Sequence, residues 1–139
     1  MKNLATLIKL HKRKVDDLKR DLGKMENEKS QLQLATENLK KELADEIALA
    51  EKQPEMGTFF GGFADRIRKR EEQIQKEIIM LDLQMIALRD EISEAFGELK
   101  KFEIALDNAK QRQKEDEARK EGVMLDDIAA QQHKRKETQ

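Results

Sequence analysis

The sequence predicts an all-α fold, a long two-helix antiparallel coiled-coil hairpin with a C-terminal overhang. Two heptad repeats of apolar residues predict it, one on each side of a short break that runs from Gln53 to Gly62. Apolar residues that alternate between spacings of four and three form the seam of a coiled coil. The break holds Pro54, the only proline of the chain, together with three glycines. This composition is typical of a turn between two helices.

The first helix is expected from about residue 3 to residue 52, because Asn3 can cap its start and Pro54 stops it. Its seam residues are Leu4, Ile8, Val15, Leu18, Leu22, Met25, Leu32, Leu39 and Leu43. Polar residues occupy four further core positions, which are His11, Lys29, Thr36 and Glu46. They can fix the register or leave a seam able to open, or a long coil can simply tolerate them.

The second helix is expected from about residue 63 to about residue 120, after a turn at 53–62 and before a tail at 121–139. Its seam residues are Ile67, Ile74, Ile78, Leu81, Met85, Leu88, Ile92, Ala95, Leu99, Phe102, Leu106 and Ala109. Each arm is about 75 Å long, whereas the extended break reaches only about 35 Å. Arms that pair within one chain must therefore be antiparallel. The sequence predicts a single hairpin domain over residues 1–139.

The composition excludes several classes of protein. Of the 139 residues 41% are charged and 4% are aromatic, which favours long solvated helices over a compact core with a deep pocket. A net charge of −1 gives no reason to expect nucleic-acid binding. The absence of cysteine excludes disulfides and thiolate metal sites. No stretch approaches the length of a membrane span and charges interrupt any signal peptide, so the simplest interpretation is a cytoplasmic protein.

Catalysis is poorly supported by the residues. The two histidines, His11 and His133, lie far apart in the sequence, each among lysines and arginines. A basic neighbourhood disfavours a metal site. There is no Ser–His–Asp set, and the Gly61–Gly62 pair lacks the ending of a phosphate-binding loop. We expect no enzymatic activity, no cofactor and no metal.

Basic runs near both ends of the chain are the first candidate for partner binding. They comprise Lys12, Arg13, Lys14 and Arg20 near the start, and Lys134, Arg135 and Lys136 near the end. In an antiparallel hairpin both runs lie at the end away from the turn, which makes that end basic and suits it to an acidic protein surface. The alternative, to which we give equal weight, is that both runs are ordinary solvated charged surface without a partner.

Apolar residues outside the seam are the second candidate. Ile79, Leu83 and Ile86 form a stripe on the second helix, which is either a docking or self-association surface or a broadened seam opposite Lys29 and Thr36. In the tail, Leu125 and Ile128 share a helical face. The turn gathers Met56, Phe59, Phe60 and Phe63, which either form an exposed binding knob or plug the end of the seam.

Two segments near the ends of the chain carry a recognisable pattern. The stretch from Leu4 to Met25 opens with leucines at positions 4, 7 and 10 and continues with the segment VDDLKRDL, and the stretch from Leu125 to Lys136 reads LDDIAAQQHKRK. The first stretch resembles the opening segment, and the second the terminal segment, of the FliJ family of bacterial flagellar export proteins. Chain length, the two-helix pattern and the position of the break agree with the family as well.

The resemblance implies a non-enzymatic protein similar to the stalk of a rotary ATPase. It implies three partners: the hexameric export ATPase, the export-gate membrane protein and export chaperones. Such a protein is cytoplasmic and reaches the cytoplasmic face of the inner membrane only through its partners. Two alternatives stay open, a homologous stalk of an injectisome secretion system and a structural coiled-coil dimer that associates through Ile79, Leu83 and Ile86.

Overall fold

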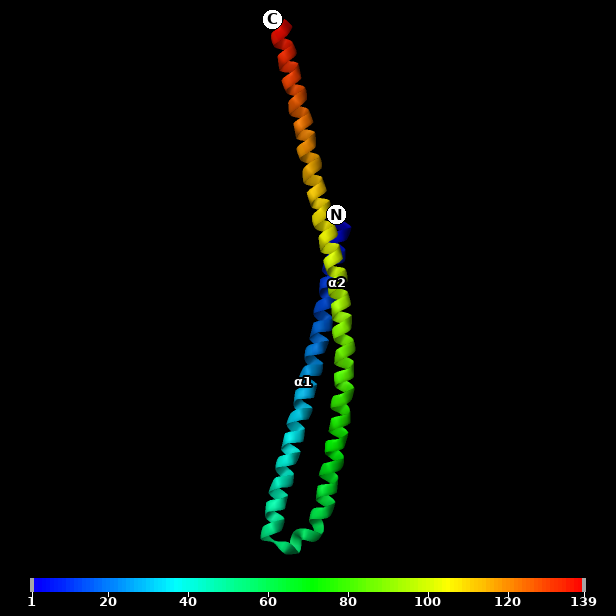
Figure 1. Ribbon diagram of the computed structural model, residues 1–139, viewed down its shortest axis with the longest axis vertical. Helices are drawn as coiled ribbons and strands as arrows, with labels where there is room; N and C mark the ends of the chain where they lie inside the picture. The colour runs from blue at the N-terminus through cyan, green and yellow to red at the C-terminus, as the bar shows by residue number, and fades with distance from the viewer. Residues whose placement is uncertain (1, 139) are drawn as a thin grey trace. The chain divides into compact units, whose positions relative to one another are not determined.

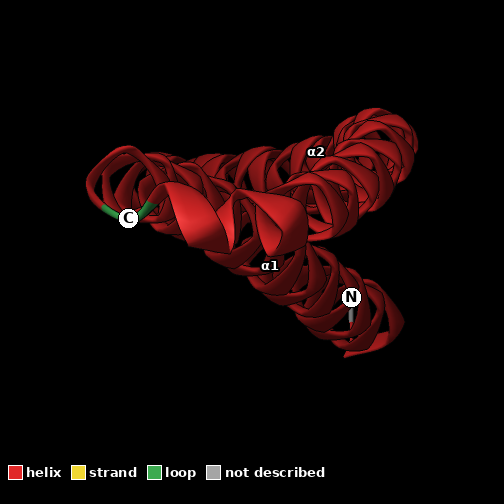
Figure 2. Cartoon of the chain, turned by 90° about the horizontal axis from the view of Figure 1, so that it is seen from below, coloured by secondary structure: helices red, strands yellow, loops and turns green. Residues whose placement is uncertain are grey.

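The structure, a computed structural model, describes the backbone of residues 2–138 and the side chains of residues 3–55 and 60–138. The chain forms helix α1 (Lys2–Lys52), a 3₁₀ turn η1 (Pro54–Met56) and helix α2 (Gly57–Thr138). Residues 2–138 contain no strand, and Figure 2 shows helix over almost their whole length. The predicted all-α fold with two long helices is confirmed.

The chain divides into two compact units. The hairpin unit comprises Lys14–Glu94, and the terminal unit joins Met1–Arg13 to Ala95–Gln139. Each unit contains one segment of α1 and one segment of α2. The two units are described separately below.

In the hairpin unit the two helices run antiparallel and lie side by side (Figure 1). Ion pairs between them show this direction: Glu26 pairs with Arg89 at 3.6 Å, and Lys29 pairs with Asp82 at 2.7 Å. Residue numbers thus rise along α1 while they fall along α2. The antiparallel hairpin predicted from the length of the break is confirmed in this unit.

The core of the hairpin unit is the predicted seam. Its buried residues all come from the expected list, and they are Val15, Ile67, Ile74, Ile78, Leu81, Met85 and Leu88. The remaining expected seam residues of this unit are half-buried. The polar core positions Lys29, Thr36 and Glu46 are half-buried as well. Burial is uneven between the helices: of the buried residues of this unit, α1 supplies Val15 and α2 supplies the other six.

In the terminal unit the start of α1 packs on a middle segment of α2. Ile8, Ala95 and Leu99 are buried there, and the His11 ring stacks on Phe102 with 4.8 Å between ring centroids. From residue 110 to residue 138 every side chain of α2 is exposed apart from the Gly122 position, which is half-buried. Figure 1 shows this stretch continuing beyond the start of α1. It is the predicted overhang.

The bounds of α2 differ from the predicted ones at both ends. The helix begins at Gly57 rather than near residue 63, and it continues to Thr138 rather than ending near residue 120. No glycine in the described part of the chain has a positive φ, so the glycines of the break join the helix. In the overhang, pairs one turn apart support the helix: Gln111 with Glu115, Gln113 with Glu117, Arg119 with Asp116, and His133 with Glu137.

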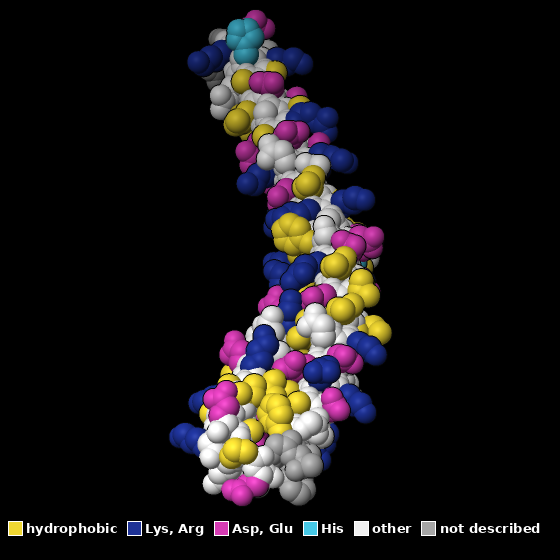
Figure 3. All heavy atoms as spheres, turned by 60° about the horizontal axis from the view of Figure 1, so that its bottom comes forward, with side chains coloured by type: hydrophobic (Ala, Val, Ile, Leu, Met, Phe, Trp, Pro, Cys, Tyr) yellow, Lys and Arg dark blue, Asp and Glu magenta, His cyan; other side chains and the backbone are white. Residues whose placement is uncertain are grey.

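The turn between the helices is short, and α1 ends at Lys52, as the sequence predicts. The Gln53 N–H donates to the Leu49 carbonyl at 3.0 Å, and Pro54 then opens the 3₁₀ turn. Phe60 and Phe63 are half-buried, and Figure 3 shows hydrophobic side chains gathered on the visible face next to the turn. The side chains of Met56 and Phe59 lie outside the described ones.

Candidate functional site

The N-terminal basic run lies on α1 with its charges in solvent. Lys12, Arg13, Lys14 and Arg20 are all exposed. Arg20 pairs with Asp17 on the same helix at 3.3 Å, while the other three form no ion pair with any described residue. These three cations are therefore free to attract an acidic surface.

His11 faces the core and does not belong to this basic surface. Its Nδ1 atom lies 3.8 Å from Glu98 Oε2, which is too long for a hydrogen bond, and it has no hydrogen-bond partner among the described residues. The ring is stacked on Phe102 at an interplanar angle of 29°. The prediction that position 11 belongs to the core is thus supported by contacts on two sides.

The C-terminal basic run is exposed as well, but it is a separate surface. Lys134, Arg135 and Lys136 lie in the last turns of α2, next to a pair between His133 and Glu137 at 3.1 Å. About 46 Å of continuous helix separates His133 from Phe102, the residue on which His11 of α1 stacks. The structure does not bring the two runs together into one basic end, because the overhang stays helical.

The overhang carries its own apolar cluster. Leu125 is 66% exposed and Ile128 is 46% exposed, and Val123 and Met124 beside them are exposed too. The side chains of residues 3–13 cover none of them. A contiguous set of apolar side chains on a single helix is a surface on which another protein can pack.

The off-seam stripe of α2 is exposed in the hairpin unit. Ile79, Leu83 and Ile86 are 52%, 59% and 55% exposed. At 100° per residue, the stripe points about 150° away from the seam of the same helix. The interpretation of the stripe as a broadened seam does not fit these exposures.

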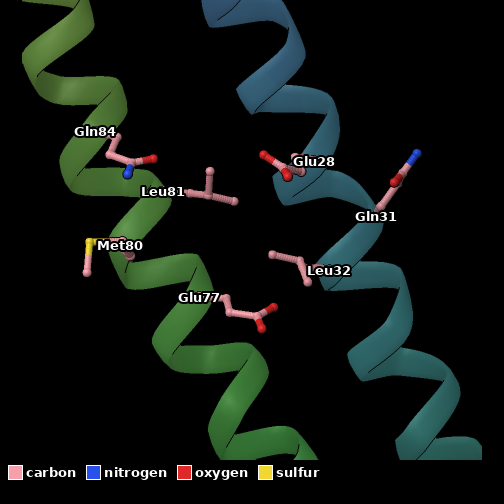
Figure 4. A pocket seen from close by; sticks show the side chains of 7 residues that line it. All are labelled: Glu28, Gln31, Leu32, Glu77, Met80, Leu81 and Gln84. Atoms are coloured by element: carbon pink, nitrogen blue, oxygen red, sulfur yellow. The ribbon is translucent and has the colours of Figure 1, made fainter.

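A groove between the two helices of the hairpin unit was not predicted. Its volume is about 390 Å³, and it is lined by Glu28, Gln31, Leu32, Glu77, Met80, Leu81 and Gln84. Figure 4 shows Leu32 and Leu81 pointing toward each other across the groove. The carboxylates of Glu28 and Glu77 also point into the space between the helices (Figure 4).

The groove lies where the seam of α1 is polar. Lys29 occupies a core position, and its ammonium group is drawn to Asp82 on α2. A second, more polar groove of about 600 Å³ includes both residues and continues past Thr36 to Lys40. The sequence contained the signal for this region, since Lys29 and Thr36 break the apolar pattern. The sequence does not show which charged side chains of α1 pair with which side chains of α2, and so it does not show which charges are left without an ion pair.

Among residues 2–138, no three His, Cys, Asp or Glu side chains converge into a group that could hold a metal ion. No helix in the described part of the chain carries an apolar stretch long enough to cross a lipid bilayer.

Comparison with known proteins gives one match. The model of a family described as "Flagellar FliJ protein" matches residues 1–138. Neither the search of curated proteins nor that of solved structures gives a match.

Proposed function

The chain belongs to the FliJ family of flagellar proteins, and on that premise we propose that it is the stalk that couples the export ATPase ring to the export gate. A member of this family is a component of the flagellar export apparatus. In the proposed role the chain performs no chemistry. It transmits the state of the ring to the gate through protein contacts.

The overhang is the observation that carries the proposal. It is a single helix with an exposed apolar cluster that includes Leu125 and Ile128. A single helix has a diameter of about 10–12 Å, which is narrower than a helix pair and suits the central opening of a hexameric ring. We propose that the overhang enters the ring and that its apolar cluster packs against the inner wall.

The basic residues of α1 would act at longer range. Lys12, Arg13 and Lys14 are exposed and unpaired within the described chain. They would attract acidic surfaces of the ring and raise the rate of association, and salt would weaken this attraction. The C-terminal run at Lys134, Arg135 and Lys136 would do the same from the overhang.

The exposed stripe at Ile79, Leu83 and Ile86 would serve a second partner. It lies in the hairpin unit, whereas the overhang belongs to the terminal unit. We propose that the export-gate protein or an export chaperone packs on this stripe. The chain would then be held at the cytoplasmic face of the inner membrane through that partner.

The experiment for ring binding is stimulation of the purified export ATPase by the full chain. Leu125→Gln with Ile128→Gln should abolish most of the stimulation, while the matched change Ile79→Gln with Leu83→Gln should retain it. Both pairs remove exposed aliphatic side chains from α2, so the helical hairpin should stay folded in both. Full stimulation by the Leu125/Ile128 variant would refute ring entry by the overhang.

A structural dimer is the second candidate, and the exposed stripe is the observation that favours it. Two copies could bury Ile79, Leu83 and Ile86 against each other as a four-helix bundle. Light scattering of the full chain should report a monomer if the stripe serves another partner. A dimer that Leu83→Glu with Ile86→Glu converts to a monomer would support the structural alternative.

A further inference from the structure

The groove of the hairpin unit combines an apolar floor with two carboxylates that have no cation. Leu32 and Leu81 face each other inside it, and Glu28 and Glu77 point into the same space (Figure 4). Neither carboxylate forms an ion pair with any described residue. By contrast, Glu26 and Asp82, which also lie between the helices, are paired with Arg89 and Lys29.

This difference in pairing gives the groove a chemical preference. Two carboxylates aimed into one space repel each other, and a cation between them relieves that repulsion. A purely charged occupant does not suit the apolar floor, because burial of the leucine side chains is favourable only when apolar surface covers them. A small polyamine would meet the carboxylates but leave the floor in water. The fitting occupant therefore carries both an aliphatic side chain and a cation next to it.

The apolar surface extends from the groove around α2. Met80 lines the groove and is 58% exposed, and it lies between the groove and the stripe at Ile79 and Leu83. A helix laid along α2 could thus bury a row of side chains one turn apart instead of a single residue. This continuity favours a helical occupant over an isolated side chain.

We infer that the groove is a docking site for a basic amphipathic helix of a partner protein, with an aliphatic residue over Leu32 and the exposed edge of Leu81 and lysine or arginine beside Glu28 and Glu77. The inference does not depend on ring entry by the overhang. A second copy of the chain, which also carries exposed basic residues near Leu10, is the competing occupant, and the oligomeric state of the chain tests it.

The test uses the full chain and a fluorescently labelled helical peptide of about 18 residues, long enough to hold a helix on binding. The peptide carries leucines at helical spacing, flanked by lysine and arginine. Anisotropy at low salt should show saturable binding. A second peptide with glutamate in place of each basic residue should not bind.

Two charge variants locate the site. Glu28→Gln with Glu77→Gln should weaken peptide binding about tenfold, as expected for the loss of two exposed ion pairs. Glu42→Gln with Glu72→Gln is the matched control, since it removes the same charge from exposed positions of the same two helices that do not line the groove. The control should bind like the unmodified chain.

A second pair of variants tests the apolar part. Met80→Gln should weaken binding several-fold, and Leu34→Gln, which removes an equally exposed apolar residue outside the groove, should not. Circular dichroism checks that all variants stay helical.

Three results would overturn the inference. The first is equal binding by the Glu28/Glu77 variant and its control. The second is equal binding of the acidic peptide. The third is a dimer of the unmodified chain that the Glu28/Glu77 variant dissolves, which would make a second copy the occupant.

Discussion

Lys29 Nζ lies 2.7 Å from Asp82 Oδ1 and so joins α1 to α2 at a position where the heptad repeat calls for an apolar residue. Both side chains are partly exposed, at 31% and 43%. A pair in this position gives up part of its hydration and gains only a screened attraction. It sets which residues of the two helices face each other, but it adds little to the free energy of unfolding.

Replacement of this lysine by an apolar residue should therefore stabilise the chain. Lys29→Leu extends the seam and leaves Asp82 at the solvent edge, where it stays hydrated. We expect a gain of about 1 kcal/mol in the free energy of unfolding, measured by urea denaturation. Lys40→Leu, at an exposed position of the same helix, is the control and should give no gain. A loss of stability in Lys29→Leu would show that the pair contributes more than this account allows.

Removal of a buried seam residue should have the opposite effect. Ile74 is 1% exposed, the most buried side chain of the described seam. Ile74→Ala should lower the free energy of unfolding by about 2–5 kcal/mol, because it removes apolar contacts and leaves a cavity. Ile79→Ala changes the same residue type on the same helix at an exposed position, and its effect should stay within about 0.5 kcal/mol. Thermal unfolding followed by circular dichroism distinguishes the two, and equal losses would contradict the assignment of the seam.

The His11 side chain carries a buried nitrogen without a hydrogen bond, and His11→Leu removes it. The change should raise the free energy of unfolding by about 1 kcal/mol, since an unsatisfied polar atom is replaced by apolar contact with Phe102. His133→Leu, in the exposed overhang, is the matched control and should leave the melting temperature unchanged. A lower melting temperature in His11→Leu would indicate that the histidine fixes the register of the helices.

Glycine inside a helix is a further site where stability can be gained. A Cβ atom added at Gly97 meets nothing within 4 Å, and the residue lies between the buried Ala95 and Leu99. Gly97→Ala should stabilise the chain by about 1 kcal/mol through helix propensity. Gly122→Ala, equally open but in the overhang, should raise helicity with little change in the main unfolding transition. If both variants shifted that transition equally, the overhang would unfold together with the packed helices.

The seam was predictable because it depends on a repeat that the sequence displays directly. Every expected seam residue is buried or half-buried, from Ile8 on α1 to Ala109 on α2. The end of α2 was not predictable in the same way. Gly122 and the highly charged run before it are typical of a helix end, but pairs such as Gln113 with Glu117 continue the helix through them.

Of the candidate surfaces, too, one was predictable from the sequence and another was not. The exposed stripe at Ile79, Leu83 and Ile86 follows from helical spacing alone. The groove depends on which charges of α1 meet which charges of α2, and a shift of one turn would place different residues opposite Glu28 and Glu77. Heptad spacing defines the seam of each helix, yet it does not specify the pairing of the flanking charges across it.

The uneven burial of the two helices has a consequence for how this chain can diverge. In the hairpin unit α2 supplies all the fully buried residues except Val15. Selection for a folded protein must therefore act most strictly on the seam of α2. The half-buried positions of α1 from Leu18 to Leu43 can exchange one aliphatic or even polar side chain for another at small cost. Such a helix can accumulate changes that suit a new binding protein while the opposite helix preserves the architecture.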